Sequence, residues 1–366
     1  MLRSLLTSAL ALAAAVPAMA ETPTVALEFR GTIELPQDLT VDGQTFGGIS
    51  GVAYDPASGV FYGVGDDLKN ARFHTIEIDL ADGTLDEGDV TVTSSVLMRD
   101  IDQQPFPDGS VDPEGLVILA NGDLLIAAEP VKDRFPAFIR RFKADGRFVS
   151  AMPLDHARYD PRLAEGRGAR ASGGFESLVL TDDKGTLYAA FEKPLGQDAA
   201  SYDPKEESTA RILVLDPETG AKSAEYVYTV GTMTLAPEPA DGGYGRGLND
   251  LLVLEPGRFL SVERQYAQGV TEGTGSRPVE IFEVSTEGAS DVKEVDALTG
   301  DETPVTKTPV LDLDTLRGNG GVERIGSHEV LVFGPDLPDG AKSLLMIEDN
   351  DFDRPTQVLL FALTRQ

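Results

Sequence analysis

The sequence contains no cysteine, no tryptophan and only three histidines, and its 31 basic residues face 61 acidic ones. Without cysteine, disulfides and a lipid-anchored N-terminal cysteine are excluded, so the fold must be held by its core alone. The histidines His74, His156 and His328 are far apart in the chain, and we do not expect a histidine-based transition-metal centre. The lack of tryptophan argues against a tryptophan-lined sugar platform.

Positive charge is scarce, and the formal net charge is −30. A chain this acidic is not expected to bind nucleic acid or anionic membrane surfaces. The charge suits divalent cations, although the general acidity of an exported protein explains it equally well.

Long apolar runs are also lacking, apart from one at the N-terminus. Arg3 is followed by an apolar stretch from Leu5 to Val16 and by Ala18-Met19-Ala20. This order is typical of a cleaved signal peptide and is too short to span a bilayer. We therefore expect residues 1–20 to be removed and residues 22–366 to form one exported domain, periplasmic or secreted, monomeric and without a membrane span.

A repeated pattern organises the rest of the chain. A polar residue opens a strand, a second strand follows after a short turn, and a further polar residue ends it, as in Asp112 to Glu129. The pattern occurs five times, at intervals of 64, 62, 73 and 74 residues between its first polar positions, which are Ser50, Glu114, Glu176, Asn249 and Glu323. Strand-rich units at such a period predict an all-β fold, a β-propeller of five blades. Because each unit is long for one blade, six blades are the alternative.

The last unit has only three predicted strands. Val25 to Leu35 alternates apolar and polar residues and has no partner within its own unit. We expect this N-terminal strand to complete the last blade and close the ring, which would remove the open sheet edges.

The repeated polar positions predict two rings at one mouth of the central channel. The first contains Ser50, Glu114, Glu176, Asn249 and Glu323, and the second contains Asp66, Glu129, Glu192, Glu263 and Asp349. So many facing carboxylates cannot all stay ionised without a counter-cation, and oxygen ligands favour Ca²⁺ over Mg²⁺. Alternatively, the acids accept backbone N–H groups and are purely structural. Ser50 and Asn249 break the acidic pattern, which favours a site.

Basic residues follow the second-ring acids in the first four units. They are Arg72, Lys132, Arg134, Lys193 and Arg264. Cations beside a bound metal would form a pocket for a phosphate or carboxylate group, whereas the alternative is local ion pairing. In the last unit, Asp349 and Asp351 place acidic side chains at alternate positions, as in a calcium loop. The segment lacks the glycine and the glutamate of an EF-hand. Gly48-Ile49-Ser50-Gly51 is not a nucleophile elbow.

Several of these motifs together resemble one known family. They are Gly47-Gly48-Ile49-Ser50-Gly51, Gly65-Asp66-Asp67, Arg72-Phe73, Asp112-Pro113-Glu114-Gly115, Phe175-Glu176, Val262-Glu263-Arg264 and Glu348-Asp349-Asn350-Asp351-Phe352. They are similar to the phytase-like domain family, also described as "esterase-like activity of phytase". The resemblance covers nearly the whole mature chain and implies an exported bacterial propeller related to calcium-dependent phytases.

The resemblance also implies roles for particular residues. Glu114, Glu176, Glu323 and the Asp349–Asp351 loop would help to hold metal, and Arg72, Lys193 and Arg264 would meet the substrate anion. Apart from the resemblance, Asn249 and Ser50, which interrupt the acidic ring, are further candidates for substrate binding. Where the family often has Glu-Gly-Leu, this chain has Glu176-Ser177-Leu178 and Glu323-Arg324-Ile325.

Three functions follow as hypotheses. The first is a calcium-dependent hydrolase of small anionic phosphoric or carboxyl esters, with Glu114 or Glu176 as the base. The second is a non-catalytic propeller that binds a ligand or a protein and uses calcium only for stability. The third is a lactonase-like sugar ester hydrolase with one channel calcium and one acid.

Overall fold

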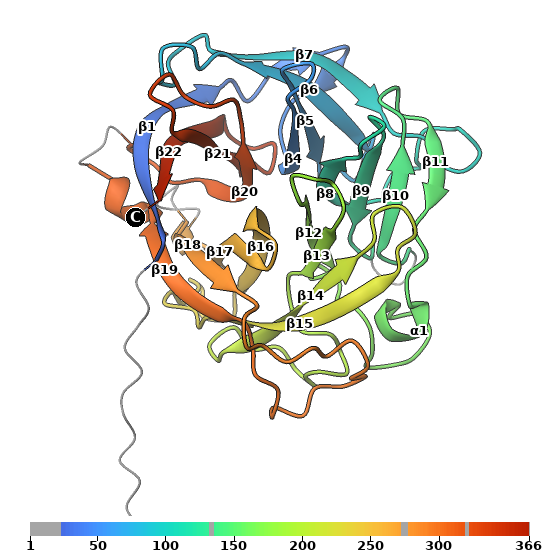
Figure 1. Ribbon diagram of the computed structural model, residues 1–366. Coiled ribbons are helices and arrows are strands. Elements are labelled where there is room, and N and C mark those ends of the chain that lie inside the picture. Colours follow the sequence, from blue (N-terminus) through green and yellow to red (C-terminus); the bar gives the residue numbers. More distant parts are fainter. Residues whose placement is uncertain (1–22, 132–134, 272–276, 319–321, 366) are drawn as a thin grey trace, which may run out of the picture.

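Five four-stranded antiparallel sheets surround a central channel (Figure 1). The computed structural model describes residues 23–131, 135–271, 277–318 and 322–365. The predicted signal peptide, together with Lys132 and Arg134, therefore lies outside the described residues. The prediction of an all-β propeller with five blades is confirmed, and the six-bladed alternative is wrong.

Each of the first four blades is built from four consecutive strands, numbered from the channel outward. Blade 1 consists of β4 (Ile49–Asp55), β5 (Val60–Gly65), β6 (Arg72–Ile78) and β7 (Val90–Leu97), and blade 2 consists of β8 (Pro113–Ile118), β9 (Leu124–Ala128), β10 (Phe138–Phe142) and β11 (Phe148–Ala151). Blade 3 consists of β12 (Phe175–Leu180), β13 (Leu187–Phe191), β14 (Ser208–Leu215) and β15 (Lys222–Val230). Blade 4 consists of β16 (Tyr244–Glu255), β17 (Arg258–Ala267), β18 (Val279–Ser285) and β19 (Thr306–Asp312).

The fifth blade joins the two ends of the chain. Its strands are β20 (Ser327–Phe333), β21 (Lys342–Asp349), β22 (Thr356–Arg365) and, on the outside, β1 (Val25–Leu35). β1 pairs with β22 along its whole length, from Val25 opposite Arg365 to Leu35 opposite Thr356. The N-terminal strand therefore closes the ring, as the sequence predicted.

Short elements lie outside the blades. They are β2 (Thr40–Val41), β3 (Gln44–Thr45), α1 (His156–Tyr159) and the 3₁₀ turn η1 (Leu313–Leu316). In the part of the chain that the structure describes, no helix has the length and apolar character needed to cross a membrane.

The core is divided among the five interfaces between neighbouring blades. The inner strands are buried on both faces, so Leu116 packs toward blade 1 while the adjacent Val117 packs toward blade 3. Successive side chains of a strand point to opposite faces, and both faces here meet another sheet. This explains the continuous apolar runs of the sequence, and it fixes the inner strands β4, β8, β12, β16 and β20 side by side around the channel.

Glycine at position 31 allows β1 to approach blade 1 closely. Gly31 lies at a β-bulge with a φ of 141° and forms a parallel bridge with Leu85, whose N–H donates to the carbonyl of Arg30. A Cβ at Gly31 would lie 2.5 Å from the carbonyl oxygen of Leu85, which is backbone and cannot simply rotate away.

We expect Gly31→Ala to lower the free energy of unfolding by about 2 kcal/mol or more, because backbone strain and a backbone clash add together. Gly88→Ala is the matched control, since Gly88 also has a positive φ of 100° but open space around it. It should cost only about 1 kcal/mol. Urea denaturation of the two variants measures the difference, and equal losses would show that the contact with Leu85 is unimportant.

Candidate metal and ester site

The first ring lies near the start of the inner strand in blades 1, 2, 3 and 5, and inside β16 in blade 4, where the strand begins earlier, at Tyr244. In every blade the pairing between the first two strands is interrupted by a register shift, and a buried polar residue occupies that irregularity. These residues are Ser50, Glu114, Glu176, Asn249 and Glu329. A β-bulge turns its residue out of the regular alternation, and here it places a polar side chain at the channel mouth in all five blades.

Glu329, rather than Glu323, is the fifth member of this ring. Glu323 is exposed and precedes β20, so its predicted place in the ring is wrong. The segment before β20 resembles the opening of a repeat, but Val322 forms only an isolated bridge with Arg317. The strand itself begins at Ser327, and the bulge at Glu329 matches those of the other blades.

The second ring is defined by the residues that pair across the start of each blade. One such pair occurs in each blade, in chain order Gly48 with Asp66, Asp112 with Glu129, Gly174 with Glu192, Gly247 with Arg264, and Ser327 with Asp349. The second residue of each pair belongs to the second ring. Arg264 therefore occupies the ring position that the sequence assigned to Glu263. A difference of one residue along a strand turns the side chain to the other face, so the prediction for Glu263 is wrong.

Glu263 instead belongs to a buried ionic network. Its carboxylate contacts the Arg246 guanidinium at 2.6 Å, forms an ion pair with Lys307, and accepts hydrogen bonds from the Tyr228 hydroxyl and from the N–H of Gly231. Despite complete burial, these cations hold the pKa of Glu263 below its ordinary value. Arg246 and Lys307 belong to blade 4, whereas Tyr228 lies on β15 of blade 3 and Gly231 directly follows that strand, so Glu263 is held between these two blades.

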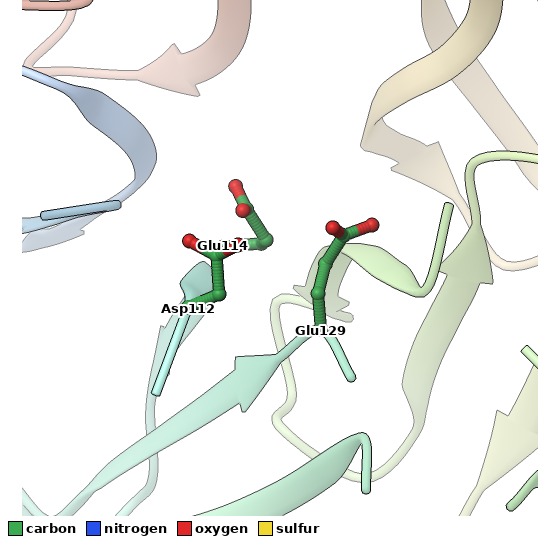
Figure 2. A group of neighbouring side chains, drawn as sticks. All are labelled: Asp112, Glu114 and Glu129. Atoms are coloured by element: carbon green, nitrogen blue, oxygen red, sulfur yellow. The ribbon is translucent and has the colours of Figure 1, made fainter. Parts of the chain in front are cut away.

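Among the residues that the structure describes, two groups of three carboxylates have the spacing of a metal site. Asp112, Glu114 and Glu129 form one, and Glu129, Glu176 and Glu192 form the other, each with oxygens within 4.8 Å of one another. Figure 2 shows the first group, with Asp112 and Glu114 at the start of β8 and Glu129 just after β9. The oxygen-only donor sets fit a hard cation such as Ca²⁺.

Burial and mutual repulsion raise the pKa values of these groups. Burial, and then the neighbouring carboxylates, raise the pKa of Glu114 and of Glu176 well above the ordinary value. Burial, followed by Glu192, raises the pKa of Glu129 to about 8, and burial raises the pKa of Asp112 to about 6. Such raised values are expected where carboxylates converge without a counter-ion, and a bound cation would reverse them.

Acids from blades 1 and 5 continue the ring. Burial raises the pKa of Asp66 well above its ordinary value, and the charge of Asp349 raises it further. Asp349 is itself buried, and its Oδ1 accepts the N–H of Asp351. The Asp351 side chain turns to Arg277, 2.7 Å away, at the rim.

The cations predicted beside the ring differ in what they contact. Lys193 Nζ lies 2.5 Å from Glu192, and Arg264 Nε lies 2.6 Å from Glu329. Both line a cleft of about 540 Å³ with Glu192, Asp349 and other residues of blades 3 to 5. Arg72 is different: it is buried, it contacts Asp67 at 2.6 Å and the carbonyl of Thr45, and it is absent from the cleft lining.

The two neutral members of the first ring make short-range contacts. Ser50 Oγ donates to the carbonyl of Gly48 at 3.3 Å. Asn249 Oδ1 accepts the N–H of Arg264 at 3.0 Å, which fixes the orientation of the amide. In the described part of the chain, Asn249 Nδ2 has no hydrogen-bond partner, so a buried donor is available beside Arg264.

Two further residues of the channel were missed at the sequence level. Asp112 stands where three other blades have glycine, and Asp250 follows the bulge where blades 1 and 2 have Gly51 and Gly115. Asp250 accepts the Ser177 hydroxyl at 2.6 Å and the N–H of Leu331 at 2.7 Å, which ties blades 3, 4 and 5 together. An aspartate at a position where similar units have glycine could have indicated both residues from the sequence.

The fold and the site define an all-β propeller of five blades with an acidic channel mouth. The family profile described as "Phytase-like: Esterase-like activity of phytase" matches residues 44–352, so the chain belongs to the phytase-like family. The resemblance stated from the motifs is thereby confirmed. Comparison with curated proteins finds no match.

Solved structures with similar chain traces are remote. An endo-arabinase from Bacteroides thetaiotaomicron is 10% identical with a TM-score of 0.47, covering 91% of this chain and 97% of that one. An endo-1,4-β-xylanase from the same organism is 10% identical with a TM-score of 0.46, covering 88% and 96%. A gluconolactonase from Xanthomonas campestris is 13% identical with a TM-score of 0.36, covering 95% and 99%. At such scores neither activity nor substrate carries over.

Glu263→Gln should destabilise the protein by about 3 kcal/mol, because it leaves Arg246 and Lys307 without their shared carboxylate. Glu255→Gln is the control, since Glu255 and Arg258 form an exposed pair 3.6 Å apart, and such pairs contribute at most about 1 kcal/mol. Denaturant titration measures both. Calcium affinity should be unchanged in Glu263→Gln, and a large loss would place Glu263 in the metal site.

The metal-free protein should become less stable as the pH rises from about 5 to about 8. The raised pKa values of Asp112 and Glu129 mean that the folded state keeps protons that the unfolded state has already released. Raising the pH therefore favours unfolding over this window, and the melting temperature should fall by at least about 2 °C.

Added Ca²⁺ should restore the melting temperature, and by more at pH 8 than at pH 5. The Glu129→Gln variant controls for general repulsion among surface acids. Its melting temperature should depend less on pH than that of the unmodified protein. If the melting temperature of that variant fell with pH as steeply as that of the unmodified protein, the ring carboxylates would not cause the pH dependence.

Proposed function

We propose that this protein is a calcium-dependent hydrolase of phosphoric or carboxyl esters that acts at the acidic mouth of its channel. The observation that supports this most directly is the convergence of Asp112, Glu114 and Glu129 within 4.8 Å. The phytase-like family supports a hydrolase in general terms, and its relation to calcium-dependent phytases supports the choice of ion.

Asp112, Glu114 and Glu129 would hold the ion. When bound, Ca²⁺ would polarise an ester oxygen and orient water. Glu192, Asp66, Asp349 and Asp351 remain further candidate ligands at the same mouth. Glu323 is withdrawn because it is exposed, and Glu263 because its carboxylate is engaged by Arg246 and Lys307.

Glu176 is proposed as the general base. It lies at the bulge of β12, beside the first carboxylate group and within the second. Burial raises the pKa of Glu176, which brings its proton affinity closer to the range useful for abstracting a proton from water. Glu114 is the alternative base if it is not a ligand.

Donors on the other side of the mouth would orient the substrate. Lys193 and Arg264 line the cleft and carry the positive charge that an anionic ester requires. Asn249 Nδ2 would add a neutral donor next to Arg264, and the Ser50 hydroxyl would serve on the opposite blade. Arg72 is withdrawn as a direct substrate contact, because its side chain is only 2% exposed and, unlike Lys193 and Arg264, does not line the cleft.

We also propose that the protein is exported to the periplasm or secreted as a monomer that begins near residue 22. The proposal rests on the apolar run from Leu5 to Val16 and on Ala18-Met19-Ala20.

The decisive experiment compares chelator-stripped and Ca²⁺-loaded protein on phosphomonoesters, carboxyl esters and lactones. We expect turnover only with Ca²⁺, and a loss of about 100-fold or more in Glu114→Gln, because a ligand or base is removed. Glu323→Gln is the matched control and should retain full activity, since Glu323 is exposed outside the ring.

The alternatives give different results. If chelation lowers the melting temperature but no substrate is turned over, the protein is a binding propeller with structural calcium. If only lactones are hydrolysed, the lactonase-like reading holds instead.

A further inference from the structure

The two carboxylate groups at the channel mouth are alike in geometry but not in their electrostatic surroundings. Each has three acidic residues with oxygens within 4.8 Å, and they share Glu129. The second group has an ammonium in direct contact, since Lys193 Nζ lies 2.5 Å from Glu192 Oε2. Among the described residues, no ion pair is formed by Asp112, Glu114 or Glu129.

Lys193 is held at this position by several contacts. Its ammonium also donates to the carbonyl of Ser172, and it lies 5.9 Å from the ring of Tyr202. The aliphatic part of the side chain packs where a Cβ on Gly173 would be 2.9 Å away. The Lys193 side chain is 17% exposed. It is therefore a fixed cation of the site and not a freely moving surface lysine.

A calcium ion bound by Glu192 would be 2.3–2.6 Å from its carboxylate oxygen. The Lys193 ammonium, in contact with the same carboxylate, would then lie about 5 Å or less from a doubly charged cation, with little water between them. The repulsion would oppose binding at the second group. Lys193 also acts on Glu129, which both groups share, but its ion-pair contact among the described residues is with Glu192, so the opposition is weaker at the first group.

We propose that Lys193 is a built-in counter-cation that occupies the second carboxylate group, so that the chain binds a single calcium ion at Asp112, Glu114 and Glu129. This inference rests on the calcium site of the proposed function and assigns its stoichiometry. Lys193 is thus a positioning residue: it restricts the ion to blade 2 and keeps a positive charge beside it on blade 3.

The same arrangement recurs one blade further on. Arg264 occupies the second-ring position of blade 4 and lies 2.6 Å from Glu329, the first-ring acid of blade 5. Side-chain cations thus contact one acid each in blades 3 and 5, namely Glu192 and Glu329. Among the described residues, Asp112, Glu114 and Glu129 are the carboxylate group in which no member forms an ion pair, and this is where the single ion is assigned.

Calcium binding by isothermal titration calorimetry tests the proposal, with about 150 mM salt to screen weak surface binding. We expect one tight site in the unmodified protein and two in Lys193→Gln, because removal of the ammonium frees the second group. Lys193→Arg keeps the charge and should still bind one ion. Lys193→Gln/Glu192→Gln removes a ligand of the new site and should return the number to one.

Thermal stability gives a second test that does not depend on the number of bound ions obtained by calorimetry. Metal-free Lys193→Gln should melt at a lower temperature than the unmodified protein, because Glu192 loses its partner, and saturating Ca²⁺ should raise its melting temperature by more. Lys193→Arg should behave like the unmodified protein in both respects.

Two tight sites in the unmodified protein, or one in Lys193→Gln, would overturn the proposal. Its failure is distinguishable from failure of the proposed function. If the unmodified protein binds two ions and hydrolyses esters only with calcium, the hydrolase stands while the role of Lys193 falls. If the unmodified protein binds no ion, the calcium site itself is absent and both fall.

Discussion

Repulsion between carboxylates that converge from neighbouring blades is the constraint on which the channel mouth depends. The propeller brings its inner strands side by side, and a bulge in each turns one polar side chain out of the regular alternation. In a buried setting such groups must be protonated, paired with a cation or bound to a metal. The protein uses different solutions in different blades. Blade 3 supplies Lys193 and blade 4 supplies Arg264, whereas blade 2 contributes three acids with no described counter-charge.

This uneven compensation gives the site a direction. The cations and the cleft lie on the side of blades 3 to 5, and the carboxylate group in which no described residue forms an ion pair, Asp112, Glu114 and Glu129, lies on blade 2. An anionic ester would therefore meet positive side chains on one side and a bound cation on the other. A ring with five identical blades would have no such preference, so the departures from the repeat carry the functional information.

The fold followed from the sequence because its signals are repeated. Five similar units and a surplus N-terminal strand were sufficient to predict the ring and its closure, which the pairing of β1 with β22 confirms. The apolar runs of the inner strands reflect burial on both faces, which is complete in β8 and nearly so in β12.

The site was only partly predictable, because it depends on register. Glu263 and Arg264 are adjacent, and only the pairing of β16 with β17 shows which of them faces the mouth. Glu323 matched the spacing of the repeat, but the fifth blade begins later and places Glu329 at the bulge. Asp112 and Asp250 replace small residues of other units, and a comparison that looked for shared residues passed over them.

The pairing of β1 with β22 also determines when the molecule can be completed. The strand at residues 25–35 has to wait until the strand at residues 356–365 has been synthesised. Until then the ring is open, with β1 unpaired, and closing it requires the longest loop closure in the protein. A chain released early would lack the partner of β1 and expose two sheet edges, and exposed edges favour aggregation. Because β1 and β22 share one blade, the ring can close only in chains that contain both strands.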